Sequence, residues 1–169
     1  MSHAAFEAFV RRYQDLVYGT AVRLLGNAMD AEDVAQTVFL RAFQRFETIG
    51  SSPAAAGWLK TVTRHECLNH LSRYRARWQF FGEPPADALV SDESPAARIE
   101  LEEQQRALEE ALTRLPDHQR VPLVLFHFDE MSYQDIAAAL GVSIGKVKTD
   151  IFRAREALRK YLGGADARR

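Results

Sequence analysis

Near the C-terminus of the chain, apolar residues recur every three or four positions, first over a short stretch and then over a long one. Ser132 can cap the first stretch as a helix, with Asp135 three residues later as in a capping box, so this helix is predicted to begin at Tyr133. Gly141 suits the left-handed residue that closes a helix, and Ser143 can cap the next one. Two helices joined by such a turn predict a helix-turn-helix.

The second of these helices has a distinct exposed face. Its buried stripe is defined by four apolar residues at helical spacing: Val147, Ile151, Ala154 and Leu158. At about 100° per residue, Gly145, Thr149 and Phe152 are predicted to point directly away from this stripe, with Lys148 and Arg153 beside them. Duplex DNA fits such a face, because cations reach phosphates or guanine edges and Phe152 can pack on a thymine methyl. A solvated amphipathic helix is the alternative, but an outward Phe among cations argues against it.

The N-terminal part is predicted to form three helices. The first carries an apolar stripe from Phe6 to Leu25 and ends at Gly26-Asn27, and the second begins near Asp30. The apolar residues of the second helix, Val34, Val38, Phe39, Ala42 and Phe46, are assigned to its buried side. A third, basic helix is predicted over 57–77, after a loop of small residues over 48–56.

Charge divides the chain into three parts. Residues 1–81 carry ten Lys or Arg and seven Asp or Glu, residues 82–110 carry two and nine, and residues 111–169 carry ten and seven. The net charges are therefore +3, -7 and +3. The acidic part opens with Gly-Glu-Pro-Pro at 82–85, which is typical of a linker. We predict an all-α fold of two small helical domains, 1–81 and 98–169, joined by a flexible acidic linker over 82–97.

Several other classes of function find no support in the sequence. No apolar run is long enough to span a membrane, and the single cysteine, Cys67, excludes an internal disulfide, so a cytoplasmic protein is predicted. His65, Cys67 and His70 do not form a zinc site, because only Cys67 and His70 share a helix face. His118 and His127 are isolated, and no catalytic constellation or phosphate-binding Gly-rich loop is present. We predict no enzyme activity, no metal and no cofactor.

Four motifs in order resemble those of the bacterial sigma-70 family. They are DAEDVAQTVFL at 30–40, Trp58-Leu59 at the start of the basic helix, Leu115-Pro116, and FRAREAL at 152–158 within the helix-turn-helix. The short build is similar to the extracytoplasmic-function (ECF) group of sigma factors. The resemblance covers about residues 6–81 and 98–162, and motifs from both parts in the right order make it more specific than a helix-turn-helix alone.

The resemblance implies partners for each part of the chain. Its implied partners are the RNA polymerase core (the beta-prime clamp helices and the beta flap), promoter DNA and an anti-sigma factor. The implied polymerase-binding residues are Asp30, Glu32, Asp33 and Gln36. The implied minus-10 residues are Ser51, Ser52, Trp58, Lys60, Arg64, Arg73 and Arg75. The implied minus-35 residues are Ser143, Gly145, Lys146, Lys148, Thr149, Phe152 and Arg153.

Two departures from the family pattern bear on DNA binding. Asp150 stands where relatives often carry Arg, and His65 where they often carry Asn, which puts some phosphate contacts in doubt. The predicted function is a sigma factor that gives core polymerase its promoter choice. One alternative is an autonomous helix-turn-helix regulator that does not need polymerase. Another is an interaction protein that keeps the polymerase-binding helix and has lost DNA binding.

Overall fold

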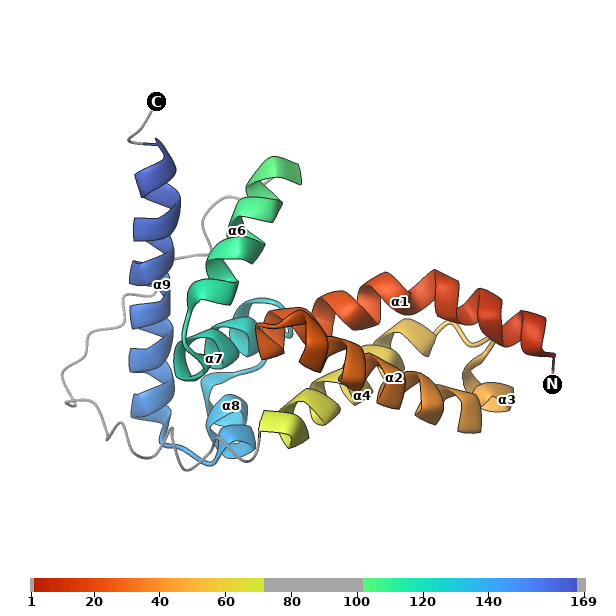
Figure 1. The fold of residues 1–169 in the computed structure, drawn as a ribbon. Coiled ribbons are helices and arrows are strands. Elements are labelled where there is room, and N and C mark those ends of the chain that lie inside the picture. Colours follow the sequence, from red (N-terminus) through yellow and green to blue (C-terminus); the bar gives the residue numbers. More distant parts are fainter. Residues whose placement is uncertain (1, 72–101, 167–169) are drawn as a thin grey trace. The chain divides into compact units, whose positions relative to one another are not determined.

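The computed structural model describes residues 2–71 and 102–166 of the 169-residue chain. The described residues form helices and turns, with no strand among them, so the all-α prediction is confirmed. They belong to two compact units, which are described separately below (Figure 1). The predicted domain boundaries at 81 and 97 and the linker between them lie outside the described residues and stay predictions.

The N-terminal unit contains three long helices and one short one: α1 (His3–Leu25), α2 (Ala28–Gln44), α3 (Phe46–Ile49) and α4 (Ala55–Leu71). Helices α1, α2 and α4 pack against one another in pairs, so each contributes one apolar stripe to a shared core. The core residues include Phe9, Val17, Ala21, Leu24, Val34, Val38, Ala42, Leu59, Cys67 and Leu71.

The helix ends of this unit follow from local chemistry. Gly26 adopts a left-handed φ of 76° and closes α1 with a hydrogen bond to the Val22 carbonyl, as predicted. Helix α2 begins at Ala28 rather than near Asp30, because the Asn27 side chain caps it and accepts the Asp30 N–H at 2.8 Å. The predicted loop over 48–56 is shorter in the structure, where α3 runs to Ile49 and α4 begins at Ala55.

The C-terminal unit consists of α6 (Glu102–Arg114), α7 (Asp117–His127), α8 (Tyr133–Leu140) and α9 (Ile144–Asp166). Helix α9 packs against the other three. The buried stripe predicted for it is confirmed, since Val147, Ile151, Ala154 and Leu158 are all buried. The facing core residues include Leu112, Leu115, Val121, Val124, Leu125, Ile136 and Leu140.

The helix-turn-helix is α8 and α9, and its capping groups are those predicted. Helix α8 begins at Tyr133, and the Ser132 hydroxyl accepts the Asp135 N–H at 3.1 Å. Gly141 has a φ of 70°, which fits the left-handed closing position. The Ser143 hydroxyl accepts the Lys146 N–H at 3.1 Å and so caps α9. The backbone that carries the predicted DNA-binding residues is therefore fixed at both sides of the turn.

A buried arginine stabilises the turn between α6 and α7. Arg120 is 3% exposed, and its Nη1 donates a hydrogen bond of 2.8 Å to the Leu115 carbonyl. Its Nη2 binds the Asp117 carboxylate one turn earlier. The guanidinium thus satisfies a carbonyl at the end of one helix and a carboxylate at the start of the next.

Candidate functional site

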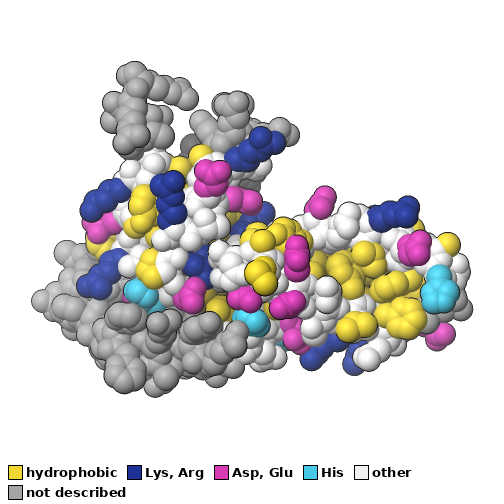
Figure 2. Space-filling model, viewed as in Figure 1, with side chains coloured by type: hydrophobic (Ala, Val, Ile, Leu, Met, Phe, Trp, Pro, Cys, Tyr) yellow, Lys and Arg dark blue, Asp and Glu magenta, His cyan; other side chains and the backbone are white. Residues whose placement is uncertain are grey.

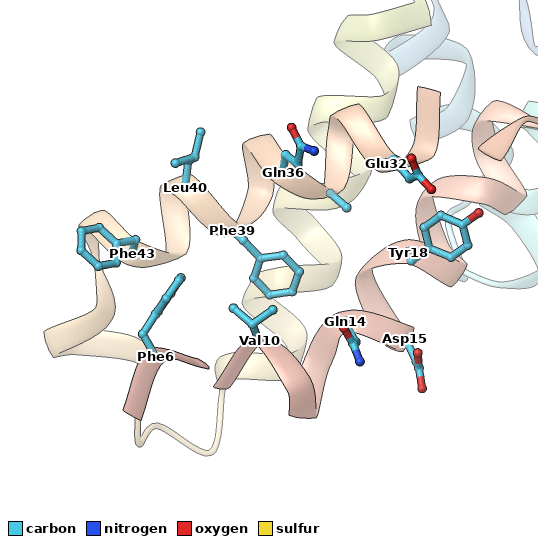
Figure 3. Close-up of a pocket in the computed structure, with 11 residues that line it drawn as sticks. Phe6, Val10, Gln14, Asp15, Tyr18, Glu32, Gln36, Phe39, Leu40 and Phe43 are labelled. Atoms are coloured by element: carbon cyan, nitrogen blue, oxygen red, sulfur yellow. The ribbon is translucent and has the colours of Figure 1, made fainter. Parts of the chain in front are cut away.

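An apolar groove of about 820 Å³ lies between α1 and α2 in the N-terminal unit (Figure 3). The groove residues are Phe6, Val10, Gln14, Asp15, Tyr18, Glu32, Ala35, Gln36, Phe39, Leu40 and Phe43. Phe39 of α2 points toward Val10 of α1 in the close-up. On the face shown in Figure 2, apolar side chains gather over this part of the unit. Apolar surface left open between two helices is typical of a site that binds a protein segment.

Two of the four predicted polymerase-binding residues line this groove. Glu32 and Gln36 lie one turn apart on the α2 side of it. Asp33 is exposed but is not among the groove residues. Asp30 is half-buried, and its Oδ2 lies 2.7 Å from Asn27 Nδ2 and 3.3 Å from His70 Nε2. Asp30 therefore contacts the α2 cap and α4.

The apolar wall of the groove was missed by the sequence reasoning. Phe39 was assigned to the buried side of its helix, yet it is half-buried and lines the groove. Leu40 is 66% exposed and Phe43 is 37% exposed. A helical projection of α2 carries the signal, because Glu32, Gln36, Phe39 and Phe43 follow at spacings of four, three and four.

Aromatic packing closes one end of the groove. The Phe6 ring meets the Phe43 ring edge to face, with centroids 5.0 Å apart, and it meets the Phe46 ring in the same way at 5.4 Å. Phe9 also packs on Phe46, at 5.5 Å. These contacts connect α1 with the end of α2 and with α3, so the shape of this end is set by the fold.

The residues predicted to bind the minus-10 element lie on α4 and in the loop before it. Ser51 and Lys60 are exposed, whereas Trp58 and Arg64 are half-buried. The Ser52 hydroxyl accepts the Ala54 N–H at 3.1 Å and so shapes the turn into α4. Arg73 and Arg75 lie outside the described residues.

On α9, five of the seven predicted minus-35 residues are at least partly accessible. Gly145, Lys148 and Arg153 are exposed, and Ser143 and Phe152 are half-buried.

The other two, Lys146 and Thr149, are buried, so the prediction that Thr149 points away from the core is wrong. Lys146 is 5% exposed, and its Nζ lies 2.8 Å from Asp150 Oδ2, which is also buried. Thr149 was predicted to point directly away from the core, but it is 3% exposed. Its neighbours around the helix, Gly145 and Arg153, are exposed, and nothing in the described residues explains its burial.

Buried charge surrounds the start of α9. Burial raises the pKa of the Asp150 carboxyl, against the opposing effect of the Lys146 hydrogen bond. His118 of α7 lies within electrostatic range of Asp150, and burial is the main cause that lowers the pKa of this imidazole. The Lys146 ammonium, the His118 imidazole and the Arg153 guanidinium thus all lie within electrostatic range of the Asp150 carboxyl.

Other kinds of site find no geometry in the described part of the chain. Within residues 2–71 and 102–166, no three His, Cys, Asp or Glu side chains come together as metal ligands. None of the described helices is long and apolar enough to cross a membrane.

Two family models match the chain, one on each unit. The model for sigma-70 region 2 matches residues 9–77. The model for sigma-70, region 4, matches residues 105–158. The first match contains α4 and every groove residue except Phe6, and the second contains α8 and α9 as far as residue 158.

Several characterised proteins are similar over nearly the whole chain. The RNA polymerase sigma-H factor of Pseudomonas aeruginosa is 30% identical, over 94% of this chain and 86% of its own length. The ECF RNA polymerase sigma factor SigW of Bacillus subtilis is 30% identical, over 94% of this chain and 89% of its own length. The RNA polymerase sigma-E factor of Streptomyces coelicolor is 37% identical, over 95% of this chain and 88% of its own length.

Among solved structures, the fold is similar to that of the sigma factor RpoE in its complex with the anti-sigma factor NepR from Bartonella quintana. The TM-score is 0.50 and the identity is 22%, over 94% of this chain and 96% of that one.

Proposed function

Since this chain belongs to the sigma-70 family of RNA polymerase sigma factors, in its ECF group, we propose that α2 binds the polymerase core and that α4 and α9 bind promoter DNA. The chain is an ECF-type sigma factor, which binds RNA polymerase core and directs promoter-specific transcription initiation. The proposal concerns which residues perform each step.

The groove between α1 and α2 is the proposed polymerase site. Its open apolar residues, Phe39, Leu40 and Phe43, offer surface whose burial drives association, at about 25 cal/mol per Å². Glu32 and Gln36 supply a carboxylate and an amide at the same wall. A helical partner with apolar and basic side chains fits both features, as the beta-prime clamp helices do in the family. Asp30 has a structural role, as its contacts with Asn27 and His70 indicate.

The proposed DNA contacts divide between the two units. In the N-terminal unit, the minus-10 residues are Ser51, Ser52, Trp58, Lys60 and Arg64, with Arg73 and Arg75 following in sequence. In the C-terminal unit, Lys148, Phe152 and Arg153 read the minus-35 element in the major groove. Ser143 and Gly145 lie at the N-terminus of α9, where backbone N–H groups favour a phosphate.

One observation carries this proposal: each unit holds its own surface of the required chemistry, apolar and acidic on α2, cationic with an aromatic ring on α9. The test adds purified protein to core polymerase and measures transcripts from a promoter library. We expect specific transcripts that depend on both components. Replacing Lys148 and Arg153 with Ala should reduce minus-35-dependent initiation, because each side-chain contact with a base contributes about 1 to 3 kcal/mol.

The rival functions predict different results in the same experiment. An autonomous helix-turn-helix regulator would bind a specific duplex tightly without polymerase. An interaction protein without DNA binding would give the same promoter use after Lys148→Ala and Arg153→Ala. The first outcome contradicts the dependence on core polymerase, and the second contradicts the assignment of α9.

Control by an anti-sigma factor is part of the proposal. The solved RpoE structure is a complex with the anti-sigma factor NepR. We expect a protein of this class to compete with core polymerase for the present chain. Competition is measured by adding the candidate inhibitor to a preformed complex with core.

A further inference from the structure

Lys146 and Asp150 form a buried ion pair at the start of the proposed DNA-reading helix. They lie one helical turn apart, and Lys146 Nζ is 2.8 Å from Asp150 Oδ2. Their side chains are only 6% and 8% exposed. The other two cations in the first three turns of the helix, Lys148 and Arg153, are exposed. One of the three cations in the first three turns of α9 is thus buried in an ion pair with a carboxylate of the same helix.

Both the backbone N–H and the side-chain ammonium of Lys146 form hydrogen bonds within α9 and its cap. Its backbone N–H donates to the Ser143 hydroxyl at 3.1 Å, and its ammonium binds Asp150. A lysine near a helix N-terminus meets the positive end of the helix dipole, so an anion one turn later is the stabilising partner within reach. His118 of α7 lies near the same carboxylate and, being a neutral imidazole, does not replace the ammonium as counter-ion.

We propose that Asp150 is a specificity-determining residue, which keeps Lys146 inside the protein and so removes one phosphate contact from the recognition helix. This inference rests on the proposed DNA-binding function of α9. A carboxylate and a phosphate compete for the same ammonium. Phosphate contacts supply essentially all of the affinity for non-specific DNA, whereas base contacts supply discrimination. Removing a phosphate contact while Lys148, Phe152 and Arg153 stay available raises the ratio of specific to non-specific binding.

The test measures binding of the full chain to a short duplex without promoter sequence, by fluorescence anisotropy over a series of salt concentrations. The variants are Asp150→Asn, Lys146→Met and the double variant. Asn keeps the size of Asp150 and removes its charge, and Met fills the buried space of Lys146 without a charge. We expect Lys146→Met to leave the affinity and the salt slope unchanged. Asp150→Asn should bind several-fold more tightly and steepen the slope of log K against log salt by about 0.9, the value for one added phosphate contact. The double variant should return to the wild-type slope.

Each other result counts against the inference. A shallower slope for Lys146→Met shows that Lys146 already contacts phosphate in the wild type. A double variant that binds as tightly as Asp150→Asn shows that the carboxylate acts by repulsion alone. A folded Asp150→Asn protein with unchanged binding also overturns the inference. If Asp150→Asn does not fold, as judged by circular dichroism, the Lys146→Met slope decides alone.

Failure of the underlying proposal is distinguishable. Lys148→Ala and Arg153→Ala should each weaken minus-35-dependent initiation by the polymerase complex, since both residues are proposed to read bases. If neither does, α9 is not a DNA-binding surface and the proposed function fails. A readout without DNA tests the pair itself: acetylation with acetic anhydride, followed by mass spectrometry, should modify Lys148 readily and Lys146 slowly. Lys146 should become reactive in Asp150→Asn, and equal reactivity of the two lysines in the wild type would overturn the inference.

Discussion

Tyr133 and Phe126 stack face to face, with ring centroids 4.7 Å apart and planes inclined by 12°. This stack joins the end of α7 to the start of α8. A cation from α9 lies at each ring: Lys148 Nζ is 5.8 Å from the Tyr133 centroid, and Arg155 Cζ is 5.6 Å from the Phe126 centroid. Both distances fall within the range of cation–π attraction. The stack therefore restricts where Lys148 can place its ammonium.

The first prediction concerns Tyr133. Replacing it with Leu removes the π face under Lys148, so binding of the polymerase complex to its promoter should weaken by about 0.5 to 1 kcal/mol, roughly two- to five-fold. Tyr133→Phe is the matched control and should bind normally, because it keeps the ring. In a Lys148→Ala background, Tyr133→Leu should cause little further loss of promoter affinity. An equal loss in both backgrounds would show that Tyr133 acts without Lys148.

The second prediction concerns the α1/α2 groove. Leu40→Ala should weaken binding to core polymerase, because Leu40 lines the groove and is 66% exposed in the free chain. Burial of most of a leucine side chain contributes about 1.5 to 2 kcal/mol, so the affinity for core polymerase should fall about ten- to thirty-fold. Met29→Ala is the control, since Met29 is 78% exposed on the same helix and lies outside the groove. The dissociation constant is measured with a fluorescent label on the chain. A similar loss for both variants would contradict the assignment of the groove.

Sequence reasoning predicted well wherever a local signal decides the structure. The caps at Ser132 and Ser143 and the turn at Gly141 depend on residues within one helical turn, and all three were found. The same reasoning placed the α2 start two residues late, because it gave weight to the acidic residues and not to Asn27 as the cap.

The errors at the sites have a different cause. A helical projection predicts which way a side chain leaves the helix, but it does not predict where a long side chain ends. The Lys146 ammonium ends at the Asp150 carboxylate, one turn away, and both side chains are buried. The α1/α2 groove depends on how far two helices lie from each other, a quantity set by the packing of Phe6, Phe43 and Phe46 and absent from the pattern of either helix.

The third prediction concerns the turn between α6 and α7. Arg120→Met should destabilise the C-terminal unit by about 1 to 3 kcal/mol, because the Leu115 carbonyl loses its buried donor. Asp117→Ala should cost less, about 1 kcal/mol or below, since the Asp117 side chain is 34% exposed and the ion pair is partly solvated. Hydrogen exchange of α7 and α9 peptides in the full chain measures the change in stability for both variants. A larger effect for Asp117→Ala would show that the carboxylate, and not the carbonyl contact, stabilises the turn.

The fourth prediction is a dependence of stability on pH through His127. Its Nε2 accepts hydrogen bonds from Arg155 Nε at 3.3 Å and Nη2 at 3.1 Å, so the imidazole must be unprotonated at that atom. Burial, and then the Arg155 charge, lowers the pKa of His127 below its ordinary value of 6.5. The unfolded chain therefore takes up a proton near pH 6.5 while the folded chain does not. Stability from this group is present above pH 6.5 and is lost as the pH falls from there toward the lowered pKa, by at most about 1.4 kcal/mol per pH unit.

His118 and Asp150 of the same unit also have shifted pKa values, and they determine how the test is designed. The pKa of His118 is also lowered by burial, so His118 adds a further loss of stability as the pH falls. The pKa of Asp150 is raised above 3.8, so its protonation acts in the opposite direction at lower pH. The informative comparison is His127→Gln against the wild type, with stability measured by hydrogen exchange of α7 and α9 between pH 7 and pH 5.5. The variant should lose the part of the slope due to His127 and keep the part due to His118. An unchanged slope in His127→Gln would mean that His127 titrates alike in the folded and unfolded chain, and that its contact with Arg155 does not depend on protonation.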